Sequence, residues 1–244
     1  MLDSHCHLDM YSKPLSIARI AAERGTFILA VTNLPTHFEK GRVFARALKG
    51  VRLALGLHPL ASEHHAEELK LFEQLFPLTS FIGEVGLDFS RQGLDTKERQ
   101  LETFRYVVEL VSRSPKVMSL HSRGAEQAAL DVLEQYGIRG AIFHWYTGSV
   151  AVLKGAIAAG HYFSVNPSMS LSKKGQETIA ILPPERILTE SDGPYAQVRG
   201  RPAQPWDVAL VEQFLANRWH KSVSEVRAII WDNFQVLLEQ LRRR

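Results

Sequence analysis

The chain has 244 residues, 45% hydrophobic and 23% charged, a composition typical of a globular protein with one sizeable core. Its net charge of +3 permits a nucleic-acid partner if the basic residues gather on one face, but does not require one. The single cysteine, Cys6, excludes an intrachain disulfide, and no apolar run approaches the roughly 20 residues of a membrane-spanning helix. Because the N-terminus also lacks a signal-peptide pattern, we expect a cytoplasmic protein with no membrane partner.

Short apolar runs alternate with amphipathic stretches along the whole chain. The predicted strands are residues 1–5, 27–32, 51–55, 80–84, 117–121, 140–144, 161–165 and 186–190. The predicted helices are residues 14–24, 36–48, 65–75, 97–113, 125–136, 150–159, 173–181, 206–219 and 224–241. This alternation predicts parallel strands joined by right-handed crossovers.

Eight strands at this length favour an α/β fold of the (β/α)8 TIM-barrel type, with additional C-terminal helices. The alternative is a doubly wound open sheet, but no GxGxxG motif follows the first strand to support it. No linker or repeat divides the chain, so we expect a single domain over residues 1–244. Residues 168–176 and 197–205 have the composition of long loops.

Two histidines close the first predicted strand. Side chains two apart on a strand point to the same face, so Asp3, His5 and His7 should share one face. Cys6 should take the other face and lie in the core. Two imidazoles aimed at one point can bind a metal ion, although for this pair alone two polar residues at a strand end are the more common explanation.

Metal-capable residues also stand at the ends of four later strands. They are Glu84, His121, His144 and Asp192. Barrel enzymes place their active sites at the carboxyl ends of the strands. One such residue could arise by chance, but strand ends that together supply four histidines and two carboxylates predict one shared pocket.

The order and wording of these motifs resemble the TatD family of deoxyribonucleases, within the amidohydrolase-like superfamily. The matching motifs are Asp3-Ser4-His5-Cys6-His7-Leu8-Asp9, Gly56-Leu57-His58-Pro59, Gly83-Glu84-Val85-Gly86-Leu87-Asp88, His121-Ser122-Arg123, Glu190-Ser191-Asp192-Gly193-Pro194 and Asn233-Phe234. They span nearly the whole chain. The motif that begins at His144 and the motif that begins at Glu190 depart from the usual family pattern, but every expected metal ligand is present. These departures and the short length also resemble the QatD type, a member of a bacterial antiphage system.

The resemblance implies a site for two divalent metal ions. One ion would be held by His5, His7 and Asp192 and the other by His121 and His144, with Glu84 bridging the two. Mixed histidine and carboxylate ligands suit Zn, Mn or Co, and Mg is compatible through the carboxylates. Two ions can clamp a phosphodiester and acidify a water, and Asp192 is the candidate to accept that water's proton.

Further residues are expected to border the pocket. His58 would contact a phosphate or orient a ligand, with a loop histidine satisfied by backbone as an equal alternative. Asp88 would hold a ligand in place, in preference to binding a third metal. Arg123 would fork onto a phosphate, in preference to a salt bridge with a loop carboxylate. Trp145 and Tyr195 offer rings on which a base could stack.

Basic residues in the two predicted loops could form a track for phosphates. They are Lys173, Lys174, Arg199 and Arg201, although a solvated surface is the usual explanation for any one of them. The C-terminal residues 242–244 are expected to be a cation cluster at a helix end rather than a binding site.

The leading functional hypothesis is a metal-dependent nuclease that hydrolyses DNA, at single-stranded ends, with Asp192, Glu84 and Arg123 as catalytic residues. If the QatD resemblance holds, antiphage defence and protein partners follow. A second hypothesis keeps the metals and changes the bond, giving an esterase or amidase such as an aminoacyl-tRNA deacylase. A third is a non-catalytic adaptor, against which the presence of all the expected ligands argues.

Overall fold

A computed structural model gives the structure of residues 1–239 and residue 241, so the predicted cation cluster at 242–244 lies outside the described residues. Within the described part, eight parallel strands form one sheet in the order β1 to β8, which curves into a nearly closed barrel. The strands are β1 (Leu2–Cys6), β2 (Phe27–Val31), β3 (Val51–Leu57), β4 (Phe81–Gly86), β5 (Val117–His121), β6 (Ile142–His144), β7 (Tyr162–Val165) and β8 (Ile187–Thr189). Each predicted strand is therefore present, with small shifts at its ends.

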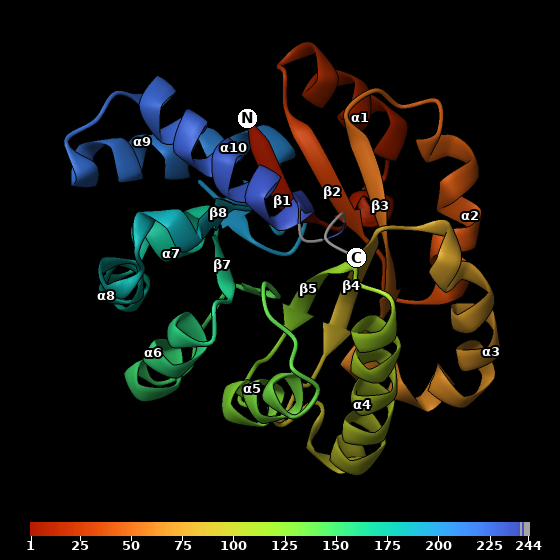
Figure 1. Ribbon diagram of the computed structural model, residues 1–244. Helices are drawn as coiled ribbons and strands as arrows, with labels where there is room; N and C mark the ends of the chain where they lie inside the picture. The colour runs from red at the N-terminus through yellow and green to blue at the C-terminus, as the bar shows by residue number, and fades with distance from the viewer. Residues whose placement is uncertain (240, 242–244) are drawn as a thin grey trace.

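Helices surround the strands (Figure 1). They are α1 (Pro14–Glu23), α2 (Pro35–Ala45), α3 (His65–Leu75), α4 (Lys97–Arg113), α5 (Glu126–Gln135), α6 (Val150–Ala158), α7 (Pro167–Leu171), α8 (Lys173–Ile181), α9 (Val208–Trp219) and α10 (Val223–Glu239). In α4, the buried residues Phe104, Val107, Val108 and Val111 recur every three or four positions. One helical face therefore packs on the sheet, which is why apolar periodicity predicted this helix correctly.

The prediction of two long loops is wrong in part. Residues 168–176 fold into α7 and the start of α8, with Ser172 Oγ accepting from the backbone N–H of Gly175 at 3.1 Å. A five-residue helix such as α7 is too short for an apolar period to show in the sequence. Residues 197–205 contain a small antiparallel hairpin, β9 (Gln197–Val198) with β10 (Arg201–Pro202).

The seam between β8 and β1 is held by a hydroxyl group and by backbone contacts beyond the strand ends. Ser4 Oγ donates to the backbone carbonyl of Thr189 at 3.0 Å. Past the end of β8, the backbone N–H of Asp192 donates to the carbonyl of His5, within β1, at 3.0 Å. This closure brings the first and last motifs of the chain side by side.

Helix α10 covers the end of the barrel at which the strands begin. The ring of Phe234 lies 5.6 Å from that of Phe27 and 6.4 Å from that of Phe81, each the first residue of its strand. The neighbouring Asn233 Nδ2 donates to the carbonyl of Ile187 at 2.8 Å. The Asn233-Phe234 motif therefore anchors α10 to this end of the barrel. The opposite end remains open.

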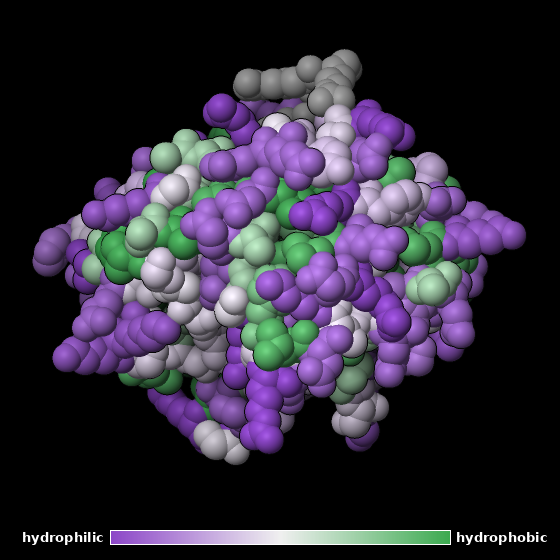
Figure 2. Space-filling model, turned by 90° about the horizontal axis from the view of Figure 1, so that it is seen from below, coloured by the Kyte–Doolittle hydropathy of each residue, from purple (hydrophilic) through white to green (hydrophobic). Residues whose placement is uncertain are grey.

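The face of the molecule drawn in Figure 2 is mostly hydrophilic, with hydrophobic side chains in small separate groups. Among the helices of the described residues, none is long and apolar enough to cross a membrane.

Candidate metal centre

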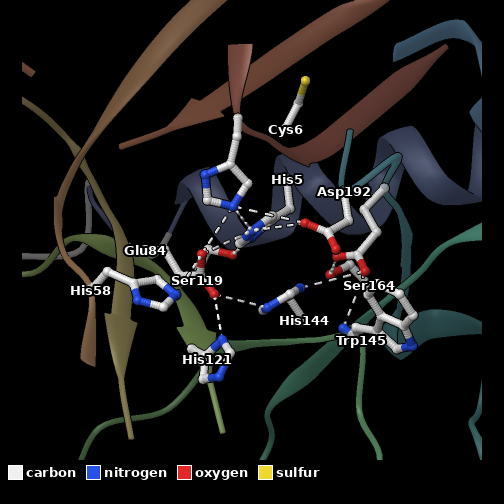
Figure 3. A network of polar contacts seen from close by, with 12 residues as sticks. His5, Cys6, His58, Glu84, Ser119, His121, His144, Trp145, Ser164 and Asp192 are labelled. Atoms are coloured by element: carbon white, nitrogen blue, oxygen red, sulfur yellow. Dashed lines mark hydrogen bonds and ion pairs between the residues drawn. The ribbon is translucent and has the colours of Figure 1, made fainter. Parts of the chain in front are cut away.

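Glu84 lies at the middle of the cluster that the sequence predicts (Figure 3). Its Oε2 is 3.0 Å from His7 Nε2 and 3.5 Å from His5 Nε2. Its Oε1 is 2.7 Å from His121 Nδ1 and 2.9 Å from His144 Nε2. Oε2 therefore faces the two histidines of β1 and its end, and Oε1 faces His121 and His144 from the middle of the chain.

Asp192 completes the set on the side of the first histidines. Its Oδ1 lies 3.8 Å from the Nε2 atoms of both His5 and His7, and the residue is only 4% exposed. Asp192 has a φ of 46°, in the left-handed region that aspartate tolerates better than most residues. The six predicted ligands thus converge at one end of the barrel.

A glycine permits the close approach of β4 and β5 beside the site. Gly86 has a φ of 135°, and a Cβ at this position would lie 2.0 Å from the carbonyl oxygen of His121. A side chain here would push the two strands apart. The glycine of the Gly-Leu-Asp motif therefore keeps Glu84 and His121 within contact distance.

Two polar side chains each contact an imidazole of the cluster at the ring nitrogen that does not face Glu84. Ser119 Oγ lies 2.7 Å from His5 Nδ1, and Asp88 Oδ2 lies 2.7 Å from His121 Nε2. Asp88 is fully buried and also accepts from the backbone N–H of Ser90 at 2.8 Å. Such contacts fix the orientation of a ring and the nitrogen it presents to a ligand.

Glu190 lies beside His144 at ion-pair distance, a neighbour that the sequence did not single out. It is fully buried, and its Oε1 lies 3.6 Å from His144 Nδ1. The same oxygen accepts from the backbone N–H of Trp145 at 3.1 Å and from Asn166 Nδ2 at 3.0 Å, while Ser164 donates its hydroxyl to Oε2. The sequence feature that could have revealed Glu190 is a charged residue at the end of an apolar strand. A carboxylate buried at such a place needs several hydrogen-bond partners.

The cluster sets a neutral imidazole, that of His5, beside an ionised carboxylate, that of Glu84. Burial lowers the pKa of His5 to about 4, so its imidazole stays neutral and keeps a lone pair. Burial alone would raise the pKa of Glu84, but the imidazoles of His58, His144 and His5 outweigh it and hold that pKa well below its ordinary value. Glu84 is therefore an ionised carboxylate in a buried site, ready to be neutralised by metal ions.

Three groups of donor atoms fit metal ions, each with its atoms within 4.8 Å of one another. They are His5 with His144 and Asp192, His5 with His7 and Glu84, and His58 with Glu84 and His121. Neutral imidazoles and carboxylates are the donors of binuclear hydrolytic centres, so the cluster is consistent with a binuclear site. The grouping differs from the implied ligand sets in two places: His58 joins Glu84, and His144 also lies beside His5.

His58 makes the backbone contact that one of the two interpretations predicts, and its ring also faces the cluster. Its Nδ1 accepts from the backbone N–H of Leu60 at 3.1 Å, as a loop histidine would. Its Nε2 nevertheless points into the cluster and lies 3.4 Å from Glu84 Oε2. The backbone contact fixes the ring so that Nε2 faces the carboxylate.

A cavity of about 760 Å³ opens over the cluster. Arg123, Trp145 and Tyr195 line it together with the cluster residues. The guanidinium of Arg123 has no ion-pair partner within residues 1–239 and 241, which leaves the salt-bridge alternative unsupported. The ring of Tyr195 meets that of His7 edge-on at 4.8 Å, and its side chain is 51% exposed.

Two other expectations have clear outcomes. Cys6 points away from the cluster (Figure 3), and it is buried in the small core that includes Ala18 and Ile28. Arg201, a candidate for the phosphate track, forks with its guanidinium onto Asp207 at 2.7 and 2.8 Å. Sequence alone could not reveal this pair, since the hairpin β9–β10 sets its geometry.

The profile of the TatD related DNase family matches residues 2–239 of this chain. The chain belongs to the TatD related DNase family. This TatD-family chain is 28% identical over 265 residues to deoxyribonuclease TATDN3 of Homo sapiens. The aligned region covers 99% of this chain and 96% of the human protein. It is 29% identical over 255 residues to the uncharacterized metal-dependent hydrolase YcfH of Escherichia coli (strain K12), covering 96% of this chain and 94% of that one.

The crystal structure of YJJV, a TatD homolog from Escherichia coli K12, shares the fold with a TM-score of 0.88 and 24% sequence identity. The match covers 97% of each chain. The predicted barrel with C-terminal helices is therefore confirmed. The prediction of a metal-dependent hydrolase of the TatD family is confirmed as well.

Proposed function

We propose that this TatD-family enzyme hydrolyses phosphodiester bonds of DNA, with the cleaved phosphate held above Glu84. The observation that carries the proposal is a buried, ionised carboxylate with imidazoles on both oxygens, beside an open cavity. Family membership and the similarity to a protein named deoxyribonuclease support DNA as the substrate.

We assign the ligands as the resemblance implies. His5, His7 and Asp192 would hold one ion, His121 and His144 would hold the other, and Glu84 would contact both because each of its oxygens faces one pair of imidazoles. Bound there, Zn, Mn, Co or Mg ions would polarise the phosphodiester and lower the pKa of an attacking water. His58 and Asp88 would orient this set.

The chain's own residues supply the rest of the chemistry. Asp192 lines the cavity with its carboxylate beside His5 and His7, so it is placed to take the proton of the attacking water. Arg123 lines the same cavity with a free guanidinium, which can fork onto a phosphate oxygen and stabilise the negative charge that develops there.

We propose unpaired DNA ends as the substrate form. Trp145 and Tyr195 border the cavity, and exposed rings bind unpaired bases by stacking. A base inside a duplex cannot reach such rings without leaving its stack. A QatD-type role in antiphage defence, with protein partners, rests on the sequence motifs alone and stays a prediction.

The test is hydrolysis by one purified sample stripped of metal and reloaded with Mg, Mn, Co or Zn. Substrates are 5′- and 3′-labelled single- and double-stranded DNA and, for the competing esterase, an aminoacyl-tRNA. We expect metal-dependent cleavage of single strands from an end. A reloaded protein that hydrolyses the ester and leaves every DNA intact would overturn the proposal.

A further inference from the structure

Two basic side chains lie at the same side of the cavity mouth. Arg123 follows β5 and lines the cavity, as does Thr147, which follows β6. Lys174, in the first turn of α8, donates from Nζ to the backbone carbonyl of Thr147 at 2.8 Å. Lys174 therefore places its ammonium against a residue of the cavity wall, although Lys174 itself does not line the cavity as Arg123 does.

The position of Lys174 is not explained by helix stability. A lysine in the first turn of a helix opposes the helix dipole, which favours negative charge there. Within the described residues the ammonium has no carboxylate partner at ion-pair distance. Its donors that do not face Thr147 remain available to a ligand.

One carboxylate also contacts this rim. Glu126 Oε1 accepts from the hydroxyl of Thr147 at 3.1 Å. Glu126 is only 8% exposed, whereas Lys174 lies on the surface. A ligand that crosses the rim therefore meets the positive charge first.

The opposite rim of the cavity has a different character. Tyr195 lies edge-on to His7, which follows β1, and Asn33, just past β2, lines the same side. In the strand order of the barrel, β1 and β2 lie across from β5 and β6. A nucleic-acid strand laid across the mouth can then place a base against the ring and its backbone against the cations.

We propose that Lys174 binds the backbone phosphate next to the one at the metal centre, so that the enzyme contacts two consecutive phosphates of one strand. Arg123 serves the first phosphate and Lys174 the second. This inference rests on the proposed function, and it adds a subsite that favours substrates with a charged neighbouring linkage.

The experiment compares thymidine trinucleotides with two ordinary phosphodiesters and the two isomers in which one linkage is an uncharged methylphosphonate. In one isomer the neutral linkage is the neighbour of the cleaved one. For the unaltered protein, kcat/KM for this isomer should be about fivefold below that for the fully charged trinucleotide, as for an exposed ion pair. Lys174→Ala should lower kcat/KM for the charged trinucleotide to the same level, so that the neutral linkage no longer matters. Lys174→Arg should keep the preference.

Lys154→Ala is the matched control, because Lys154 has the same charge, is exposed on the neighbouring helix α6 and does not line the cavity. It should keep the preference for the charged linkage. The proposal is overturned if Lys174→Ala still prefers the charged trinucleotide to the isomer with the neutral neighbouring linkage, or if Lys154→Ala loses this preference equally. Failure of the metal-loaded protein to cleave any of them would instead contradict the proposed function. In that case the affinities of the same trinucleotides for the unaltered protein and Lys174→Ala still decide the subsite.

Discussion

Glu190 lies behind His144, with its Oε1 3.6 Å from the imidazole Nδ1, while Nε2 on the other side of the ring lies 2.9 Å from Glu84. One imidazole thus stands between two buried carboxylates. The outer carboxylate is itself fixed by Trp145 and Asn166. We expect the orientation of this central histidine to depend on Glu190, which does not line the cavity.

Glu190→Gln should weaken metal binding and leave the fold intact. The amide keeps the shape of the side chain but loses the charge beside His144 Nδ1, so metal affinity should fall roughly ten- to a hundredfold. Titration of the metal-free protein measures this, and activity should recover at saturating metal. Glu185→Gln, at an exposed carboxylate nearby, is the control. Equal metal affinity for Glu190→Gln and the unaltered protein would show that Glu190 does not position His144.

Arg123→Ala should separate substrate binding from metal binding. A guanidinium has no lone pair to offer, so metal content should not change. Loss of a charge-assisted contact should lower kcat/KM for DNA roughly ten- to a hundredfold, and Arg123→Lys should restore only part of it. Thermal melting of the same sample decides the alternative: a variant that melts earlier and loses activity only with its folded fraction has lost a structural salt bridge.

Tyr195 tests the stacking side of the cavity. Tyr195→Ala should raise KM for single-stranded oligonucleotides, because stacking of one base contributes roughly 1–3 kcal/mol. Tyr195→Phe keeps the ring and should behave as the unaltered protein. Hydrolysis of a simple phosphodiester without a base, such as bis(p-nitrophenyl) phosphate, should change little in either variant. A similar loss on both substrates would mean that Tyr195 supports His7 rather than a base.

The sequence predicted the strands and the convergence of the cluster because both follow from local patterns. Apolar runs marked the strands, and parallel strands in a barrel bring their carboxyl ends together, so His5, His121 and His144 had to meet. The side on which Cys6 lies followed from the two-residue period of a strand.

Contacts between distant segments could not be predicted in this way. The environment of Glu190 depends on Ser164 and Asn166, which are 26 and 24 residues away in the chain. The contact of Glu84 with His121 depends on how closely β4 approaches β5 at Gly86. Neither relationship leaves a periodic signal in the sequence.

The most direct test of the metal centre is a joint measurement of bound metal and DNA hydrolysis for the unaltered protein and Glu84→Ala. The unaltered protein should bind about two divalent ions per chain and lose DNA cleavage on chelation, with recovery on reloading. Glu84→Ala removes the carboxylate that faces both pairs of imidazoles, so it should bind less metal and cleave almost no DNA while remaining folded. A folded Glu84→Ala protein with unchanged metal content and turnover would contradict the account.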